Sequence, residues 1–463
     1  MIMIKNNEFL STEPVGKLLF KLAIPTIAAQ VINMLYNVVD RIYIGHMPEV
    51  GDLALTGVGV CMPIIMIVSA FAALVASGGA PRASIFMGKG DKDTAERIMG
   101  TCFSAQIIVS AIITAVLLIW NEDILLAFGA SEDTIEYALE YMNVYAAGTI
   151  FVQLTLGMNS YITAQGFTKI SMLTVIIGAV ANIILDPIFI YGLDMGVRGA
   201  AVATIISQGI SCVWVVLFLF GKKTVLRLKS QTLSIDVKLL LPCIALGSAH
   251  FIMQASESVI FICFNTSLRT YGGDIAVGAM TILTSVMQFA MMPLQGLAQG
   301  SQPITSYNFG AKNATRVKRV FKILLAVSLS YSVLLWAFIM LLPRTFAGIF
   351  TPEPELIEFA ASALRIYCAA LGIFGLQIAC QMTFVSLGNA KASVLVAVVR
   401  KFVLLLPLIY LMPAILEDKT TAVYLAEPIA DVIAVTFTGV LFYFQFKKSI
   451  ASIEHPSDVG KTE

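Results

Sequence analysis

Charged side chains are scarce in this sequence: Asp, Glu, Lys and Arg make up only 13% of its 463 residues. The seven cysteines form no CxxC pair and fall mostly inside apolar runs, which argues against a metal site or a disulfide framework. No HExxH or GxSxG motif occurs, and GKGDK at 88–92 lacks the spacing and the Ser or Thr of a phosphate-binding loop. We therefore expect no enzymatic activity, no ATP hydrolysis and no cofactor. The net charge of +1 gives no reason to expect a nucleic acid partner.

Apolar residues dominate instead, at 58% of the chain with a mean hydropathy of +0.86. Apolar runs of about 18 residues or more are typical of transmembrane helices. The polar start, MIMIKNNEFLSTEPVGKLLF, has no pattern of a cleavable signal peptide. The sequence predicts an all-α integral membrane protein in a lipid bilayer, with twelve spans at 17–40, 53–78, 99–120, 136–163, 171–192, 199–220, 239–266, 275–299, 320–342, 357–386, 393–412 and 422–446.

The distribution of Lys and Arg predicts the orientation of these spans, because cytoplasmic loops carry the excess of basic residues. With alternating connections, 24 of the 30 basic residues fall on the side of the N-terminus. We expect both termini in the cytoplasm and a multi-pass location in the inner (cytoplasmic) membrane. The opposite side holds six basic residues: Arg41, Arg198, Arg269, Arg344, Arg365 and Lys419.

The two halves of the chain repeat each other. KLAIPTIA at 21–28 matches KLLLPCIA at 238–245 in five of eight positions. This offset of 217 pairs Asn37 with Gln254 and Asp40 with Glu257. Further along, an offset of 222 pairs Asp52 with Asp274, Gly78 with Gly300, Pro81 with Pro303, Gly88 with Gly310, Arg97 with Arg319, Tyr145 with Tyr367, Gly166 with Gly388 and Ser171 with Ser393.

Six spans per repeat is an even number, so both repeats enter the membrane from the same side. We expect two six-helix bundles, 1–220 and 239–446, related by a pseudo-twofold axis along the membrane normal. The basic segment 221–238 would be a cytoplasmic linker, and 447–463 a cytoplasmic tail. Transporters with such repeats place the substrate site between the halves.

Polar side chains in the first half predict a cation site. Asp40 lies in an apolar span, where a carboxylate costs about 2.5–3.5 kcal/mol. Asn182 and Asp186 share one helix face, and Thr204 follows in the next span at similar depth. Oxygen ligands suit Na⁺, and two nearby carboxylates would raise each other's affinity for a proton. Alternatively Asp40 is solvated beside Arg41, Asn182 makes a helix–helix hydrogen bond, and Thr204 is a packing residue.

The second half has a different set of polar side chains. Its offset positions for Asn182 and Asp186 are leucines, so we expect the ion chemistry in the first half. Arg400 and Lys401 are expected to snorkel to the inner surface. The remaining candidates, which line a cavity or serve packing and capping, are Gln377, Gln381, Glu427, Asp431 and the methionines Met280, Met287, Met291 and Met292.

Several motifs together resemble one transporter family. They are IPTIAAQVINMLYNVVDRIYIGH in the first span, the Gly-Ala-Pro turn ASGGAPRASIFMGKGD after the second, NIILDPIFIYGLDMGVRGAAVATIISQ, GLAQGSQPITSYNFGAKN and AEPIAD. The chain resembles the multidrug and toxic compound extrusion (MATE) family, in its MepA-like bacterial branch. The resemblance covers nearly the whole chain.

The resemblance implies a V of two six-helix bundles around a central cavity. It implies export of small organic, often cationic, compounds in exchange for H⁺ or Na⁺, hence a role in antibiotic resistance. By motif match the cation-coupling residues are Asp40, Asn182, Asp186 and Thr204, with Asn159 at another matching polar position and Na⁺ possible at Asp40 and Asp186. We add Asn37 to this set, because it lies one turn before Asp40. We assign Glu257, Gln254, Met287, Met291, Gln381 and Asp431 to the substrate cavity. Pro25 matches the proline at which the first helix can bend.

The sequence departs from one branch of that family. Glu257 matches an acid used in the NorM-like branch, but the tenth span, FGLQIACQMTF, lacks the second acid of that branch. Glu257 could therefore face a cationic substrate. The alternative function is a flippase of the wider superfamily that moves a lipid-linked or amphipathic metabolite; the scarcity of basic residues at depth argues against it. We expect the chain to act as a monomer.

Overall fold

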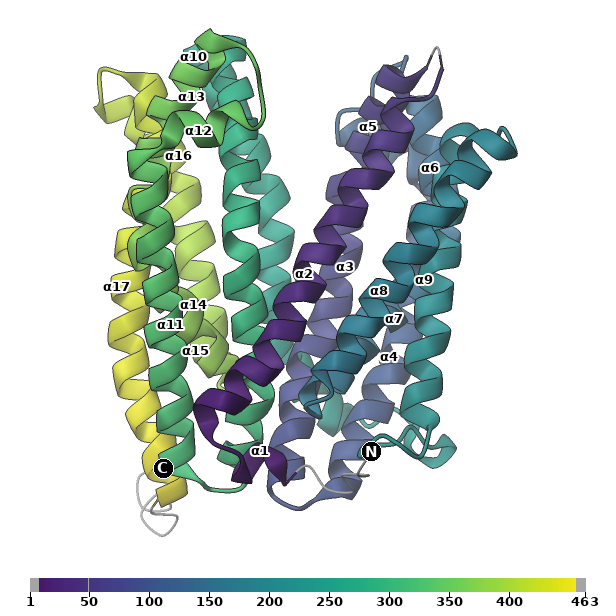
Figure 1. The fold of residues 1–463 in the computed structure, drawn as a ribbon, viewed down its shortest axis with the longest axis vertical. Helices are drawn as coiled ribbons and strands as arrows, with labels where there is room; N and C mark the ends of the chain where they lie inside the picture. The colour runs from purple at the N-terminus through teal and green to yellow at the C-terminus, as the bar shows by residue number, and fades with distance from the viewer. Residues whose placement is uncertain (1–7, 49, 455–463) are drawn as a thin grey trace.

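A computed structural model describes residues 8–48 and 50–454. These residues form helices and no strand, in two bundles that meet at one end and separate toward the other (Figure 1). The predicted fold class is confirmed. Two bundles arise because the chain forms six spans on each side of the linker that follows Phe220.

The first bundle contains six spans. They are α2 (Val15–Gly45), α3 (Gly51–Gly88), α4 (Lys92–Ile119), α6 (Ile135–Ala147) with α7 (Thr149–Ala164), α8 (Thr168–Pro187) with the π-helix η1 (Ile188–Gly192), and α9 (Gly196–Phe220). Short helices α1 (Phe9–Thr12) and α5 (Asn121–Ala127) precede α2 and follow α4.

The second bundle begins with α10 (Val237–Gly310), which holds two spans joined at Gly273. Glycine is suited to this junction because its φ is 67°, in the left-handed region. The other spans are α11 (Ala314–Leu341), α13 (Pro354–Tyr367) with α14 (Leu371–Ser386), bent by 51°, the run of α15 (Ala390–Val398), η3 (Val399–Leu405) and α16 (Leu406–Ile415), and α17 (Lys419–Glu454). The short α12 (Pro343–Gly348) follows α11.

The sequence offset of 222 recurs in the helix boundaries. α4 and α11 begin and end 222 residues apart, and so do α7 and α14. Equivalent side chains also cap equivalent helices: Asp91 accepts from the Thr94 amide at 3.0 Å, and Asn313 accepts from the Arg316 amide at 3.1 Å. The repeat in the sequence is therefore a repeat in three dimensions.

The structure corrects four predicted boundaries. α3 and the second span of α10 continue to Gly88 and Gly310, so the glycine- and proline-containing segments expected to form turns are helical. α10 begins at Val237, inside the predicted linker. α17 continues through residues 447–454 of the predicted tail, and the rest of that tail, 455–463, lies outside the described residues.

The helical glycine segments exist because the two bundles touch there through backbone. A Cβ at Gly78 would lie 1.9 Å from the Cys243 carbonyl oxygen. At Gly88 it would lie 2.0 Å from the Tyr307 oxygen, and at Gly310 1.9 Å from the Ile85 oxygen. Only glycine permits this approach, which holds the bundles together at one end.

We expect Gly78→Ala to open this contact, because the added methyl group overlaps backbone that cannot rotate away. Overpacking of this kind typically costs about 1–3 kcal/mol. In a chain whose other six cysteines are alanine, Cys243 should react faster with a membrane-permeant maleimide, and efflux should fall. Gly59→Ala is the control, since a Cβ there meets nothing within 4 Å. Equal labelling in the two variants would show that the contact does not depend on glycine.

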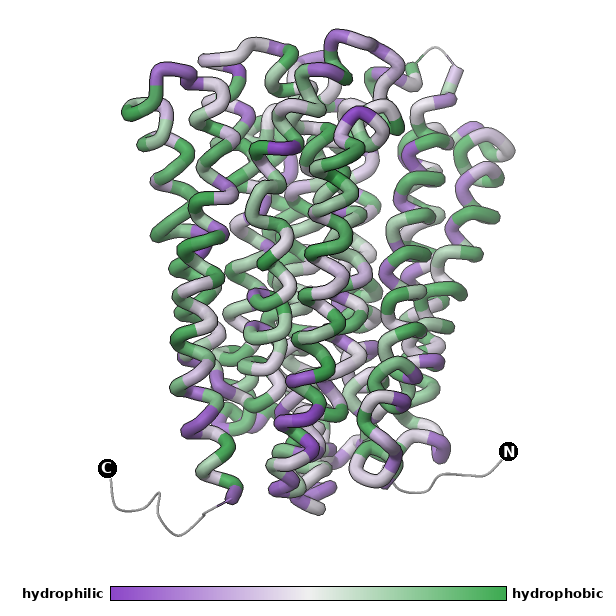
Figure 2. Tube along the Cα trace, turned by 60° about the vertical axis from the view of Figure 1, so that its left-hand side comes forward, coloured by the Kyte–Doolittle hydropathy of each residue, from purple (hydrophilic) through white to green (hydrophobic). Residues whose placement is uncertain are grey.

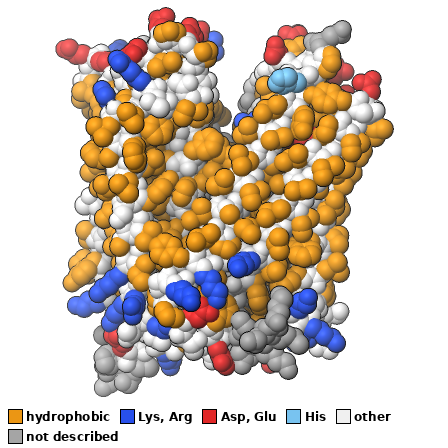
Figure 3. Space-filling model, in the orientation of Figure 1, with side chains coloured by type: hydrophobic (Ala, Val, Ile, Leu, Met, Phe, Trp, Pro, Cys, Tyr) orange, Lys and Arg blue, Asp and Glu red, His pale blue; other side chains and the backbone are white. Residues whose placement is uncertain are grey.

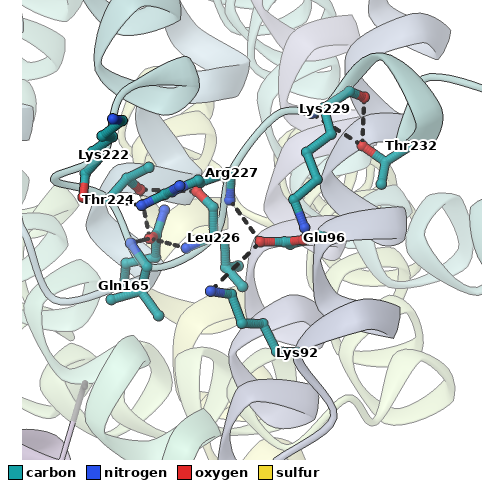
Figure 4. Close-up of polar contacts among 10 residues, drawn as sticks. Lys92, Glu96, Gln165, Lys222, Thr224, Leu226, Arg227, Lys229 and Thr232 are labelled. Carbon is teal, nitrogen blue, oxygen red and sulfur yellow. Dashed lines mark hydrogen bonds and ion pairs between the residues drawn. The ribbon is translucent and has the colours of Figure 1, made fainter. Parts of the chain in front are cut away.

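The linker between the bundles is fastened to the first bundle (Figure 4). Gln165 Oε1, buried at the end of α7, accepts from the Thr224 hydroxyl at 2.8 Å and from the amides of Val225 and Leu226 at 2.9 and 2.7 Å. Glu96 of α4, also buried, accepts from the Arg227 amide at 3.1 Å. Glu96 further pairs with Lys92 and Lys229.

We expect Gln165→Leu to release this linker, because three hydrogen bonds worth about 0.5–1.5 kcal/mol each are lost. Limited trypsin digestion of inside-out vesicles should then cleave faster at Lys222, Lys223 or Arg227. Gln231→Leu, at an exposed position of the same linker, is the matched control and should digest like the original chain. Unchanged digestion of Gln165→Leu would contradict the anchoring role.

The surface matches a bilayer environment. The helices are apolar over their middle lengths, and hydrophilic residues concentrate toward the two ends (Figure 2). Lys and Arg gather at the end that carries α1 and the last turns of α17 (Figure 3). The helices are long and apolar enough to cross a membrane, so this is a multi-pass membrane protein.

Candidate functional site

Two carboxylates meet inside the first bundle. Asp40 lies near the end of α2 and Asp186 near the end of α8, with exposed fractions of 5% and 0%. The two carboxyl groups lie close enough to influence each other electrostatically. Within the part of the chain that the structure describes, neither carboxylate forms an ion pair. Asp40 is therefore not a solvated surface residue paired with Arg41, which is itself exposed.

Asn182 completes a set of oxygen atoms around this pair. Its amide Nδ2 donates to Asp186 Oδ1 at 2.9 Å, across one turn of α8. Asp40 Oδ1, Asp186 Oδ2 and Asn182 Oδ1 are buried and accept no hydrogen bond from the described residues. Buried acceptors without a donor are costly, and a proton or a cation would satisfy them. The three unsatisfied atoms are all oxygens, which is the ligand type that a hard cation prefers.

Tyrosines surround the carboxylates, and the sequence did not predict them. The Tyr36 hydroxyl, on α2, lies near Gln208 and Asn37 and near both carboxylates. Tyr141, buried in α6, lies near both Thr204 and Asp40. Thr204 is thus placed beside Tyr141, close to the site. A one-turn spacing between Tyr36 and Asp40 was the available signal, but tyrosine is common in membrane helices for other reasons.

The backbone next to the site is irregular. Pro187 follows Asp186 directly and has no amide hydrogen, and the chain then continues as the π-helix η1. π-type turns occur frequently at functional sites. Here the turn ends α8 immediately after the carboxylate and turns the chain toward α9.

Asn37 and Asn159 have more distant positions. Asn37 Nδ2 donates to the Asn33 carbonyl at 2.6 Å, one turn back along α2, and its side chain also lies near the Tyr36 hydroxyl. Asn159 donates to the Ser171 carbonyl at 3.3 Å, near the start of α8, while Asp186 lies near the end of that helix. The structure therefore does not bring Asn159 to the carboxylate pair.

Gln381, assigned to the substrate cavity, makes the equivalent contact in the second bundle. Gln381 is buried, and its Nε2 donates to the Ser393 carbonyl oxygen at 3.1 Å and to the Ser393 hydroxyl at 2.9 Å. Both pairs, Asn159–Ser171 and Gln381–Ser393, are related by the offset of 222. Each pair joins two helices inside a bundle.

The prediction that Arg400 and Lys401 snorkel to the inner surface is wrong. Both lie in η3, near the middle of the span from Ala390 to Ile415, with exposed fractions of 7% and 3%. They are stabilised there by acids from other helices. Lys401 Nζ pairs with Glu257 Oε1 at 2.6 Å.

Arg400 is held by the two acids of α17. Its Nε donates to Asp431 Oδ1 at 2.8 Å and its Nη2 to Glu427 Oε1 at 3.0 Å. The guanidinium also lies 4.7 Å from the centre of the Phe374 ring. The sequence allows two roles for Glu427 and Asp431, cavity lining or helix capping. In the structure both are buried ion-pair partners of Arg400.

The other cavity candidates have mixed surroundings. Met287 and Met291 are half-buried against the core of the second bundle, and Met287 Sδ lies 3.7 Å from Cys368 Sγ. Gln254 is half-buried one turn before Glu257. The described residues contain no group of three or more His, Cys, Asp or Glu side chains that could hold a metal ion.

Pro25 lies inside α2, which runs from Val15 to Gly45. The next residue, Thr26, donates its hydroxyl to the Gly296 carbonyl of α10 at 2.6 Å. A Cβ on Gly296 would overlap the backbone of Ile27. The proline thus lies where α2 contacts the second bundle, nearer the start of α2 than Asp40.

Comparison with known proteins adds family evidence. The MatE family model matches residues 25–188 and 249–411. The multidrug export protein MepA of Staphylococcus haemolyticus (strain JCSC1435) is 24% identical over 397 residues, covering 84% of this chain and 85% of that protein. MepA of Staphylococcus aureus (strain N315) is 22% identical over 408 residues, covering 88% and 89%.

A solved structure has the same fold. An outward-facing conformation of a multidrug resistance MATE family transporter of the MOP superfamily superimposes with a TM-score of 0.89. It is 23% identical and covers 98% of this chain and 99% of that chain. The match spans both bundles, so the arrangement of all spans is shared.

Proposed function

This chain belongs to the MatE family, and on that premise we propose that it is a secondary multidrug antiporter. It exports organic, cationic compounds in exchange for H⁺ or Na⁺. The single observation that carries the coupling is the Asp40–Asp186 pair, buried and without an ion-pair partner among the described residues. An ion that neutralises the pair removes a buried like-charge repulsion.

The ion changes the conformation through its differential affinity for two states. α2 carries Asp40 and α8 carries Asp186, so binding between them draws two helices together. Pro25 weakens α2 where it contacts Gly296 of α10, because a proline leaves one backbone carbonyl without its helical donor. Bending of α2 there would narrow the space between the bundles and displace the exported compound.

The charge of the second bundle favours a cationic compound. Two basic residues do lie at depth, contrary to expectation, but Arg400 and Lys401 face three acids: Glu257, Glu427 and Asp431. The cluster is one unit negative. A flippase for an anionic lipid-linked sugar would be expected to present net positive charge to its substrate, so this cluster argues against the alternative.

The end of the molecule with clustered Lys and Arg faces the cytoplasm in this proposal (Figure 3). The bundles then open to the outside, and the glycine contacts close the cytoplasmic end. The cell membrane would be the inner, cytoplasmic one, with both termini inside, and the chain would act as a monomer.

Transport into everted vesicles tests the function. Ethidium uptake should be driven either by an imposed Na⁺ gradient or by an imposed pH gradient, and the effective gradient identifies the ion. Vesicles without the protein are the control. Equal uptake with and without both gradients would overturn antiport.

A further inference from the structure

The charge cluster of the second bundle differs from the site of the first bundle in one respect. By the offset of 217, Glu257 of α10 corresponds to Asp40 of α2. Asp40 forms no ion pair among the described residues, whereas Glu257 binds the Lys401 ammonium at 2.6 Å. By the offset of 222, the first bundle has Ala179 where the second has Lys401. In the second bundle, a lysine ammonium of the chain itself therefore supplies the positive charge beside this acid.

The two members of this pair are covered to different extents. Lys401 is enclosed by its own bundle, with 3% of its side chain exposed, while 54% of the Glu257 side chain is open. The ammonium thus approaches one side of the carboxylate from within the bundle. The other side of the carboxylate stays free for a second partner.

Glu257 lies on α10, the helix whose preceding turns contact the first bundle. Cys243 and Gly247 touch α3 of the first bundle, and the Phe251 ring lies 4.9 Å from the Phe71 ring of α3. Glu257 lies about 1.7 turns beyond Phe251, and at about 100° per residue its direction is rotated by about 40° from that of Cys243. Beyond these contacts the bundles separate, and the surface is hollowed between them (Figure 3).

We infer that Lys401 is a built-in counter-ion that restricts the second-bundle site to singly charged cations. This inference rests on the proposed function and deepens it, because it assigns the charge class of the substrate to one residue. Lys401 does not touch the exported compound. It acts through Glu257 and is a positioning residue.

Charge counting gives the physical basis. Three acids and two bases leave one negative charge in the cluster. A singly charged compound beside Glu257 brings the cluster to neutrality, whereas a doubly charged one leaves an excess positive charge in a poorly solvated place, which is unfavourable. Without Lys401 the cluster would carry two negative charges, and the doubly charged compound would be the neutralising one.

The experiment compares two probes on purified protein in detergent. They are tetraphenylphosphonium and a bis-phosphonium in which two such groups share an alkyl linker. We expect Lys401→Gln to raise the affinity for the bis-phosphonium relative to tetraphenylphosphonium by about tenfold, the effect of about 1.4 kcal/mol. Lys401→Arg keeps the charge and should keep the original ratio.

The outcomes separate the inference from the proposed function. An unchanged ratio in Lys401→Gln, or an equal change in Lys401→Arg, overturns the role of Lys401 and leaves cation export standing. If the original protein binds neither probe, the proposed cationic substrate class falls, and the inference with it.

A second variant covers poor folding of Lys401→Gln. Glu257→Gln removes the open acid and leaves Lys401 uncompensated, so tetraphenylphosphonium affinity should fall about tenfold or more. Unchanged affinity in Glu257→Gln would show that the open carboxylate does not bind the cation, which also overturns the inference.

Discussion

Asp186→Asn and Asp40→Asn are each expected to abolish active efflux. Cells that produce either variant should accumulate ethidium like cells without the protein. The reason is electrostatic: each asparagine keeps the size of the side chain but removes a charge that the coupling ion must neutralise. With one carboxylate left, the difference in ion affinity between the two conformations shrinks, and the ion gradient no longer biases transport.

Both variants should be present in the membrane in normal amounts. A carboxylate buried beside another carboxylate is unfavourable, so replacing one of them with a neutral amide does not weaken folding. Asp52→Asn, at an exposed acid in the first turn of α3, is the matched control and should export ethidium normally. Normal efflux by both Asp40→Asn and Asp186→Asn would refute the assignment of the coupling site.

Arg400→Met is expected to cause the largest loss of stability. It leaves Glu427 and Asp431 buried next to each other without the guanidinium that binds both. Removing one partner of a buried ion pair typically costs about 3–5 kcal/mol. Thermal unfolding of the detergent-purified protein should therefore occur at a clearly lower temperature, or the yield of folded protein should collapse.

A triple variant distinguishes the charge effect from the loss of packing. Arg400→Met combined with Glu427→Gln and Asp431→Asn leaves no charge in this triad, and most of the lost stability should return. Arg269→Met, at an exposed arginine, is the control and should unfold like the original protein. If Arg400→Met alone is as stable as the original, the ion pairs do not stabilise the bundle.

Much of the architecture was predictable because periodic and compositional signals carry it. Long apolar runs predicted the spans, and the offset of 222 reappears in the matched bounds of α4 and α11. Asp40, Asn182 and Asp186 were identifiable because a buried acid in an apolar span needs an explanation. Their convergence followed from the i, i+4 spacing on α8 and from similar depth.

The errors have physical causes of their own. The sequence predicts Arg400 and Lys401 at the membrane surface because a lone base in an apolar span usually snorkels, whereas their acidic partners are 27 to 144 residues away in the chain. Asn159 and Gln381 resemble site residues in the sequence because any membrane-embedded amide does. The offset pairing of Ser171 with Ser393 held the clue that these amides share a structural role. Tyr36 and Tyr141 are not recognisable from the sequence, because the sequence does not show that Tyr36 shares a face of α2 with Asp40 or that α6 packs next to it.

The central claim is that the Asp40–Asp186 pair binds the coupling ion. Its most direct test is transport by one proteoliposome preparation under two conditions, substrate counterflow without an ion gradient and uphill uptake with one. Asp186→Asn should retain counterflow of radiolabelled tetraphenylphosphonium and lose gradient-driven uptake, since its substrate path is intact and its ion site is not. Gradient-driven uptake by Asp186→Asn at the rate of the original protein would contradict the claim.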